Sequence, residues 1–232
     1  MTKLGIDIQL HKQTLIKILI DLAKEMGEKI AFKGGTCAYL FYDLPRLSLD
    51  LDFDVLADLT EEDVEKIKYL LARHGAIKDF RQKHNTIFFL LDYLPNTPNI
   101  KIEFNKRVWE NNNYKTIWFL GVEIAIADEQ TIFTNKLVAL TDRRQVLARD
   151  LFDVYYFLTI GLPVNEKLIK ERTGKTVREY LKLLPKFIKT HYSEKNILSG
   201  LGEILAEKQK TWAKKELIKE AIKWIEKLIN TK

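Results

Sequence analysis

The sequence of 232 residues predicts an α+β fold in which a mixed sheet comes first and a helical region follows. Up to residue 128, short runs of alternating or β-branched residues separated by turn residues predict strands, with helices between them. After Asp128 the apolar residues recur at helical spacing as far as the end of the chain. We therefore expect two domains, an α/β core over residues 1–128 and a helical domain over residues 129–232.

The first elements surround a pair of glycines. Apolar residues at helical spacing predict an amphipathic helix over Thr14–Met26, which ends near Gly27. We predict a short buried strand at Ile30–Phe32 that runs directly into the glycines, and a helix at Cys37–Tyr42 that starts just after them. Pro45 disfavours further helix and separates these elements from the next.

The following segment alternates apolar and acidic residues. Over Leu49–Leu56 this alternation has the period of a strand with one acidic face. Thr60 is the expected N-cap of the next helix, because three acidic residues follow it in the first turn. Further strands are expected at Ile87–Tyr93, at Ile100–Phe104 and within Ile117–Ile126.

Composition gives the broad class. The chain is 46% hydrophobic and 30% charged, which is ordinary for a globular protein. Its single Cys37 cannot form an internal disulfide. The N-terminus lacks the apolar core of a signal peptide, and no apolar run reaches the roughly 20 residues that span a bilayer. We therefore expect a cytoplasmic protein without a membrane partner.

The charge of +6 is unevenly distributed. Residues 161–232 carry 17 Lys and Arg against 9 Asp and Glu, a net charge of +8, which leaves −2 for residues 1–160. A basic helical region beside an acidic region suits a polyanionic partner such as RNA. A lysine-rich solvated surface is the alternative interpretation.

Asp50 and Asp52 form the first chemical motif. They lie two residues apart on a predicted strand, so both carboxylates project from the same face. Two like charges this close repel each other, and a divalent cation is the simplest compensation. Carboxylate oxygens favour Mg²⁺ or Mn²⁺, and Mg²⁺ typically takes one or two carboxylates together with substrate phosphates.

Gly34, Gly35 and Thr36 form the second motif, at a junction between a strand and a helix. Glycine lets backbone N–H groups approach a phosphate closely, and the start of the helix adds the positive end of its dipole. The Thr36 hydroxyl is a further donor. This tripeptide alone is equally consistent with a plain turn, but beside the paired aspartates it predicts a phosphate site next to a metal site.

A third carboxylate is expected for a site with two metal ions. Glu103 is the candidate, because it lies on a strand downstream of the aspartates, although an exposed strand residue is an alternative interpretation. Asp54 shares the strand face of Asp50 and Asp52 but lies further from the glycines, which makes it the weaker candidate.

Three segments together carry a resemblance to a known family. They are Lys33-Gly-Gly-Thr, Arg46-x-Ser48-x-Asp50-Leu-Asp52-Phe, and Lys136-Leu-Val-Ala-Leu-Thr-Asp-Arg-Arg with the later Arg149-Asp150-Leu-Phe-Asp153-Val-Tyr. Over roughly residues 15 to 160 the chain resembles the AbiEii/AbiGii toxin family of nucleotidyltransferases, which includes MenT-type toxins. The resemblance implies a polymerase-β-like core, an NTP substrate, Mg²⁺ as cofactor and often a cognate antitoxin. Some relatives modify the acceptor end of tRNA.

The resemblance also assigns residues. By position, Gly34 to Thr36 match the phosphate-binding turn, Asp50 and Asp52 the metal ligands, Lys136 a contact to the triphosphate, and Asp150 and Asp153 the acids of the family's helical motif. Lys136 as a solvated lysine, and Arg149, Asp150 and Asp153 as a structural ion-pair cluster, remain open alternatives. The predicted catalytic residues are Asp50, Asp52, Lys136 and Asp150; the predicted NTP contacts are Lys33, Gly34, Gly35, Thr36, Ser48 and Lys136; the predicted metal ligands are Asp50, Asp52 and Glu103.

The function that follows is metal-dependent transfer of a nucleotide from an NTP to an acceptor, with RNA such as tRNA expected, and a role as the toxin of a toxin–antitoxin system. Two alternatives stay open. One is a nucleotidyltransferase that modifies a small molecule such as an antibiotic. The other is a non-catalytic module that senses nucleotides or binds proteins.

Overall fold

The computed structural model describes residues 7–231, which fall into two compact units. The first, here called the sheet unit, comprises residues 7–43, Leu47–Val108 and Tyr114–Ala127. The second, here called the helical unit, comprises Leu44–Arg46, Trp109–Asn113 and residues 128–231. Short segments of the N-terminal half thus belong to the helical unit, a detail that the pattern of the sequence does not show.

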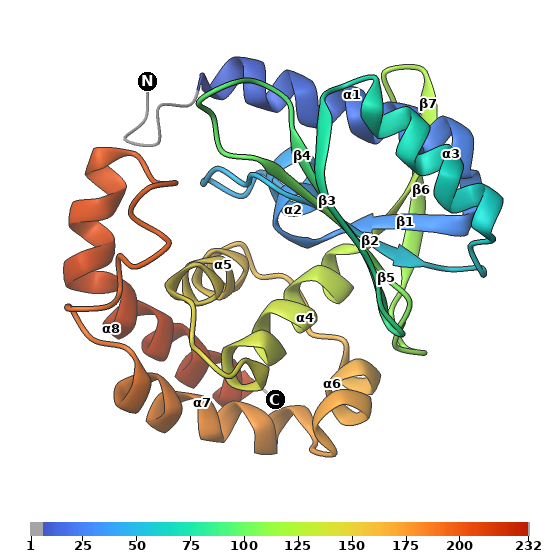
Figure 1. Ribbon diagram of the computed structural model, residues 1–232. Helices are drawn as coiled ribbons and strands as arrows, with labels where there is room; N and C mark the ends of the chain where they lie inside the picture. Colours follow the sequence, from blue (N-terminus) through green and yellow to red (C-terminus); the bar gives the residue numbers. More distant parts are fainter. Residues whose placement is uncertain (1–6, 232) are drawn as a thin grey trace. The chain divides into compact units, whose positions relative to one another are not determined.

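The sheet unit contains one mixed sheet of seven strands in the order β3-β4-β5-β2-β1-β7-β6 (Figure 1). The pairs β1–β7 and β2–β5 are parallel and the other neighbours are antiparallel. The mixed sheet confirms the predicted α+β class. The strands are β1 (Ile30–Lys33), β2 (Leu51–Val55), β3 (Ala76–Gln82), β4 (Thr86–Asp92), β5 (Ile100–Asn105), β6 (Tyr114–Phe119) and β7 (Val122–Ala127).

One face of the central strands is a buried aromatic layer. Phe53 of β2 lies between Phe32 of β1 and Phe104 of β5, with ring centroids 5.3 Å and 5.1 Å away. All three side chains are buried. Because side chains alternate along a strand, burying this face fixes the register and turns the acidic residues of β2 to the opposite face.

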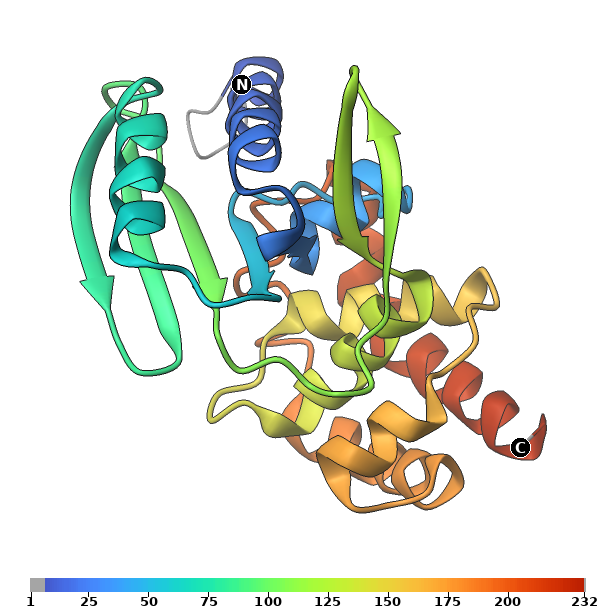
Figure 2. The same cartoon turned by 90° about the vertical axis from the view of Figure 1, so that its right-hand side faces the viewer.

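Three α-helices belong to the sheet unit: α1 (Ile8–Met26), α2 (Gly34–Phe41) and α3 (Glu61–Ala72). α1 and α3 lie side by side, α1 against β7 and α3 against β3 (Figures 1 and 2). α1 begins earlier than the predicted Thr14, because the Asp7 carboxylate accepts the backbone N–H groups of Gln9 and Leu10 and so caps the helix there. The N-cap at Thr60 is confirmed, within a capping box that includes Asp63.

Two strand predictions need correction. β3 was not expected, because an edge strand rich in charged residues lacks the apolar alternation of a half-buried strand. β2 is shorter than the predicted Leu49–Leu56 and begins at Leu51, so Asp50 immediately precedes it. The carbonyl of Asp50 accepts a hydrogen bond from the Thr36 hydroxyl.

The helical unit contains five α-helices, α4 (Glu129–Asp142), α5 (Ala148–Thr159), α6 (Glu166–Thr173), α7 (Val177–His191) and α8 (Glu207–Thr231). Its helical character after Asp128 is as predicted, and Asp128 itself caps α4 by accepting the N–H of Thr131 at 2.7 Å. α4 packs against α5 and α6, and both α5 and α7 pack against α8. Within residues 7–231, every helix is too short or too polar to cross a membrane.

Candidate active site

The acidic face of the central strands gathers several predicted site residues in one row. Asp52 of β2 pairs in register with Lys33 of β1 on one side and with Glu103 of β5 on the other. Residues directly opposite each other on neighbouring strands project from the same face. Asp52 is half-buried and Glu103 is exposed, so an acidic row with one lysine beside it is open to solvent.

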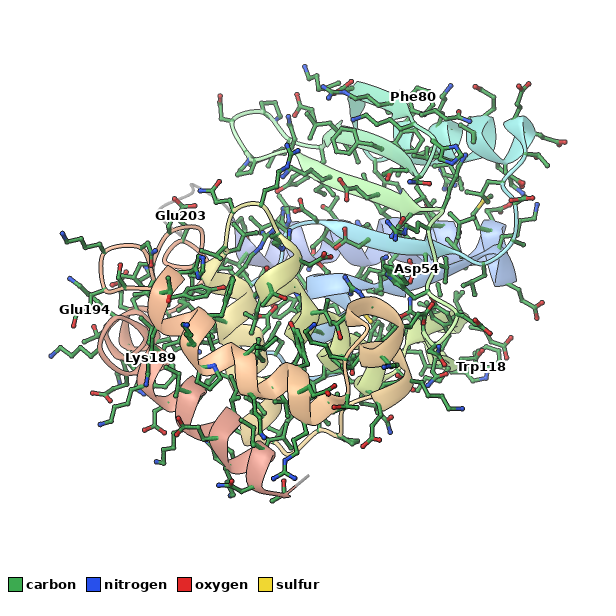
Figure 3. All side chains as sticks on the ribbon, turned by 90° about the horizontal axis from the view of Figure 1, so that it is seen from below. Asp54, Phe80, Trp118, Lys189, Glu194 and Glu203 are labelled. Atoms are coloured by element: carbon green, nitrogen blue, oxygen red, sulfur yellow. The ribbon has the colours of Figure 1, made fainter. Side chains whose placement is uncertain are left out.

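Asp54 lies one register step further along β2 and is 1% exposed. Its carboxylate accepts a hydrogen bond from the Lys33 ammonium. It accepts a second one from the Tyr114 hydroxyl, which lies 2.8 Å away. Figure 3 labels Asp54 beside the ribbons of the central strands. The pairing neutralises a buried carboxylate and holds Lys33 beside Asp52, so Asp54 positions its neighbours.

The glycine turn touches this row directly. β1 ends at Lys33 and α2 begins at Gly34, whose φ of +79° is a conformation that side chains with a Cβ rarely adopt. A Cβ built at Gly34 would lie 2.3 Å from Asp52 Oδ2. The first-turn N–H groups of α2 have no acceptor inside the helix, and together they form a positive end suited to a phosphate. The structure therefore packs the carboxylate of Asp52 against the predicted phosphate turn.

Thr36 and Ser48 fix the segment that leads into Asp50. The Thr36 hydroxyl is buried, donates to the backbone carbonyl of Asp50 and lies 2.9 Å from the Ser48 hydroxyl. The Asp50 carboxylate accepts the backbone N–H of Lys101 at 3.3 Å. Thr36 thus ties the start of α2 to the aspartate segment, whereas its predicted contact to a nucleotide stays a prediction.

His11 supports the same segment from α1. Its Nε2 lies 3.2 Å from the carbonyl oxygen of Leu49, and its Nδ1 lies 2.8 Å from the Tyr93 hydroxyl. Because a carbonyl can only accept, Nε2 carries the proton and Nδ1 accepts from Tyr93. Burial lowers the pKa of His11, against the opposing effects of Leu49 and Asp50, which keeps the ring neutral. This role of His11 could not be predicted from the sequence pattern, because Leu49 and Tyr93 lie far from His11 along the chain.

We expect Gly34→Ala to lower nucleotidyl transfer about 10²-fold, because a displacement of about 1 Å in a reacting group can cost that much. The new methyl group would occupy the place of the Asp52 carboxylate and push it out of the row. Steady-state transfer rates with purified variants measure the effect.

Gly121→Ala is the matched control. Gly121 has a φ of +81°, but a Cβ there would meet no atom within 4 Å. Both glycines have a positive φ, so both variants carry backbone strain, about 1–2 kcal/mol for a left-handed conformation. Equal activity of the two variants would mean that the contact between Gly34 and Asp52 has no part in the reaction.

The helical unit holds a second polar cluster around Lys136, Asp150 and Asp153. Lys136 Nζ of α4 lies 2.8 Å from Asp153 Oδ2 and 3.2 Å from Asp150 Oδ1, both on α5. Arg46 donates two hydrogen bonds to the Asp153 carboxylate, from Nε at 2.5 Å and from Nη2 at 2.6 Å. Arg143 Nε lies 2.7 Å from Asp150 Oδ2, but off the direction of a hydrogen bond, so this contact is an ion pair only.

This cluster is almost completely buried. Asp150 and Asp153 are 0% exposed, and Arg46 is 5% exposed. Burial alone would raise the pKa of Asp153, but the charges of Arg46 and Lys136 outweigh it and hold the pKa below its usual value. The structure thus excludes a freely solvated Lys136 and makes Arg46 and Arg143 partners of the acids, which the sequence pattern did not identify.

The predicted site residues are thus divided between the two units. The sheet unit holds Lys33, Gly34, Gly35, Thr36, Ser48, Asp50, Asp52 and Glu103. Lys136 and Asp150 belong to the helical unit. Across residues 7–231, no three acidic, histidine or cysteine side chains are gathered as a preformed metal site. Glu103 as a third ligand therefore stays a prediction.

Comparisons with solved structures agree on the fold. JHP933 from Helicobacter pylori superimposes with a TM-score of 0.59 at 20% identity, over 99% of this chain and 97% of that chain. A second H. pylori structure, of a protein provisionally assigned as a nucleotidyltransferase, gives 0.59 at 21% identity, over 97% and 99% of the two chains. An antigenic nucleotidyltransferase-like protein from Paracoccidioides brasiliensis gives 0.50 at 14% identity, over 84% and 94%.

These identities establish a shared fold and nothing finer. No curated protein sequence matches the chain. The family model described as nucleotidyl transferase AbiEii toxin, type IV toxin–antitoxin system, matches residues 17–216, which is most of the chain. The resemblance inferred from the three motifs is confirmed. The chain is a nucleotidyltransferase and belongs to the AbiEii toxin family of type IV toxin–antitoxin systems.

Proposed function

We propose that this protein transfers a nucleotide from an NTP to an RNA acceptor such as tRNA, in a reaction that depends on Mg²⁺ or Mn²⁺. The observation that carries the proposal is the contact between Asp52 and the Gly34 turn. It joins a carboxylate suited to a cation to a helix start suited to a phosphate, and an NTP bound as its metal complex requires both groups together.

The residues of the sheet unit suit a divalent cation. Asp50 and Asp52 would hold it, with Glu103 beside Asp52 as the third carboxylate. Since Mg²⁺ binds through one or two carboxylates plus substrate phosphates, the site does not need a preformed cage. When bound, the metal would neutralise charge on the triphosphate and on the leaving pyrophosphate.

The protein's own residues would position the substrate. The first-turn N–H groups of Gly34, Gly35 and Thr36 would donate to the triphosphate, while Lys33 adds a positive charge at the same end of β1. Ser48 holds Thr36 in place and can donate to the nucleotide. Lys136 as a triphosphate contact and Asp150 as a catalytic acid rest on their match to the family motifs alone.

The net charge of the C-terminal region supports RNA as the acceptor, and the family supports a toxin–antitoxin setting. The net charge of +8 over residues 161–232 favours a polyanion, for which RNA is the expected choice. Type IV toxin–antitoxin membership implies a cognate antitoxin. The reaction then belongs in the cytoplasm, where NTPs and tRNA are both present.

The decisive experiment incubates the protein with each labelled NTP in turn, Mg²⁺ and total tRNA, and then separates the RNA on a gel. We expect label in RNA with at least one NTP and none when EDTA replaces the metal. A parallel reaction with aminoglycosides tests for a small-molecule acceptor. Label in the small molecule but not in RNA would refute the RNA acceptor, and NTP binding without transfer to either would favour a sensing module.

A further inference from the structure

The helical unit contains a groove that the nucleotidyl-transfer chemistry does not use. Its lining residues come mainly from α7, with others from α4 and α6, and its volume is about 660 Å³. Figure 1 shows the place of these three helices in the helical unit. Small-molecule sites typically measure about 300–1,000 Å³. The lining residues are Val138, Thr141, Asp142, Arg172, Thr173, Lys175, Tyr180, Lys182, Leu183, Lys186, Phe187, Thr190 and His191.

Part of the groove is apolar and aromatic. Leu183, Phe187 and His191 follow one another at intervals of four residues on α7, so they form one ridge along the helix. The rings of Phe187 and His191 stack with centroids 4.0 Å apart and an interplanar angle of 18°. Leu183 is 48% exposed and His191 is exposed, so the ridge offers flat and apolar surface to a ligand.

Tyr180 anchors the groove wall. Its hydroxyl donates to the Leu137 carbonyl at 2.9 Å and lies 2.9 Å from the Thr141 hydroxyl. Burial raises the pKa of Tyr180 to about 12, so the phenol stays neutral near pH 7. Tyr180 therefore adds no negative charge to the groove at that pH.

The charged side chains of the groove are mostly cationic. Arg172 is paired with Asp142, the one acid in the lining, at 2.9 Å. Lys175, Lys182 and Lys186 are exposed, and none of them makes an ion pair with an acid within residues 7–231. Of these, Lys175 interacts electrostatically with the neighbouring Glu179. Lys182 and Lys186 thus border the aromatic ridge as positive charges that form no ion pair within the described residues.

We propose that this groove binds a single-stranded segment of the RNA acceptor, with phosphates on Lys182 and Lys186 and a base on the Phe187 ridge. Single-stranded nucleic acids are bound by this combination of cations that follow the backbone and aromatic rings on which bases stack. An acidic protein segment would match the lysines but would have no particular use for a stacked ring pair. The identification of the ligand as RNA rests on the proposed function; the position and chemistry of the groove do not.

The test measures binding without catalysis. A labelled single-stranded RNA of about 12 nucleotides, long enough for the site sizes of such proteins, is titrated with the full chain at several salt concentrations, without NTP or Mg²⁺. In Lys182→Gln/Lys186→Gln we expect weaker binding and a salt slope smaller by about 1.4, since each phosphate contact on a single strand contributes about 0.7. In Phe187→Ala we expect about tenfold weaker binding, from the loss of one stacked base.

Lys214→Gln/Lys215→Gln is the matched control. Both lysines are exposed on α8 and neither lines the groove, so this variant removes the same charge from the same unit. Lys189, labelled in Figure 3, also lies outside the lining, although it is on α7. We expect it to keep the wild-type affinity and salt slope. Circular dichroism and thermal melting check folding, and the lysine pair carries the test alone if Phe187→Ala does not fold.

Three results of the binding assay would overturn the inference. The first is that the wild type does not bind RNA, and the second is that the two double-lysine variants lose RNA affinity equally. The third is that a polyglutamate peptide competes as strongly as unlabelled RNA and that Phe187→Ala does not change this competition. The last result would assign the groove to an acidic protein partner. A wild type that labels RNA, with groove variants that also label it normally, would refute the groove and leave the proposed function standing.

Discussion

Asp52→Asn is expected to lower nucleotidyl transfer by about 10³-fold while leaving the fold intact. A bound metal contributes several kcal/mol of charge stabilisation, and each 1.36 kcal/mol is a factor of ten in rate. The amide is the same size as the carboxylate, so the contact with Gly34 is kept while the charge is lost. Initial rates of label transfer at saturating NTP, over a range of Mg²⁺ concentrations, measure the loss.

Asp50→Asn should behave in the same way, because its amide oxygen can still accept the N–H of Lys101. Asp92→Asn on β4 is the control: it makes the same change in the same sheet, where the carboxylate pairs with Lys78 at 3.2 Å. We expect near wild-type transfer from it. If Asp52→Asn were as active as Asp92→Asn, the assignment of the metal to Asp52 would be wrong.

Arg46→Met is expected to lower the free energy of unfolding by about 3–5 kcal/mol, the usual cost of breaking a buried ion pair by removing one partner. The variant leaves Asp153 fully buried with Lys136 as its remaining cation. Methionine fills most of the same space, so the effect reports the lost charge and hydrogen bonds. Urea unfolding followed by circular dichroism measures it.

Arg178→Met, on the exposed side of α7, is the matched control and should change the stability by less than about 0.5 kcal/mol. The dependence on pH adds a second readout. Because the pKa of Asp153 is held below 3.8 in the folded state, its stabilising effect is complete above that value and is lost as the pH falls through the folded pKa. Without Arg46 that pKa rises, so acid unfolding should begin at a higher pH. Identical acid transitions for wild type and Arg46→Met would contradict the role of this pair.

The sequence by itself determined the class of fold, the family and the chemistry. Helical periodicity, capping residues and alternation are local patterns, so α1, α3, β2 and the helices after Asp128 could be predicted from neighbouring residues. The glycine turn and the paired aspartates are also local, since they lie within about 20 residues of each other. Their combination was specific enough to identify the family that the comparison confirmed.

Other features depend on contacts between distant parts of the chain. Arg46 and Asp153 are 107 residues apart, and Tyr114 and Asp54 are 60 residues apart. No periodicity within a short window carries information on which cation neutralises a buried carboxylate. The charged edge strand β3 was missed for the same reason, because its pairing with β4 defines it and its own residues do not.

The candidate active site and the groove show most clearly which features the sequence predicts and which only the tertiary structure decides. Sequence predicted that Gly34 and Asp52 serve the same nucleotide, but only the antiparallel register of β1 and β2 brings the Asp52 carboxylate onto the glycine. Sequence also predicted a basic C-terminal third, but only the packing of α6 beside α4 and α7 decides which lysines border a groove. The residue type determines which chemistry a side chain can perform, whereas tertiary packing determines which groups that side chain contacts.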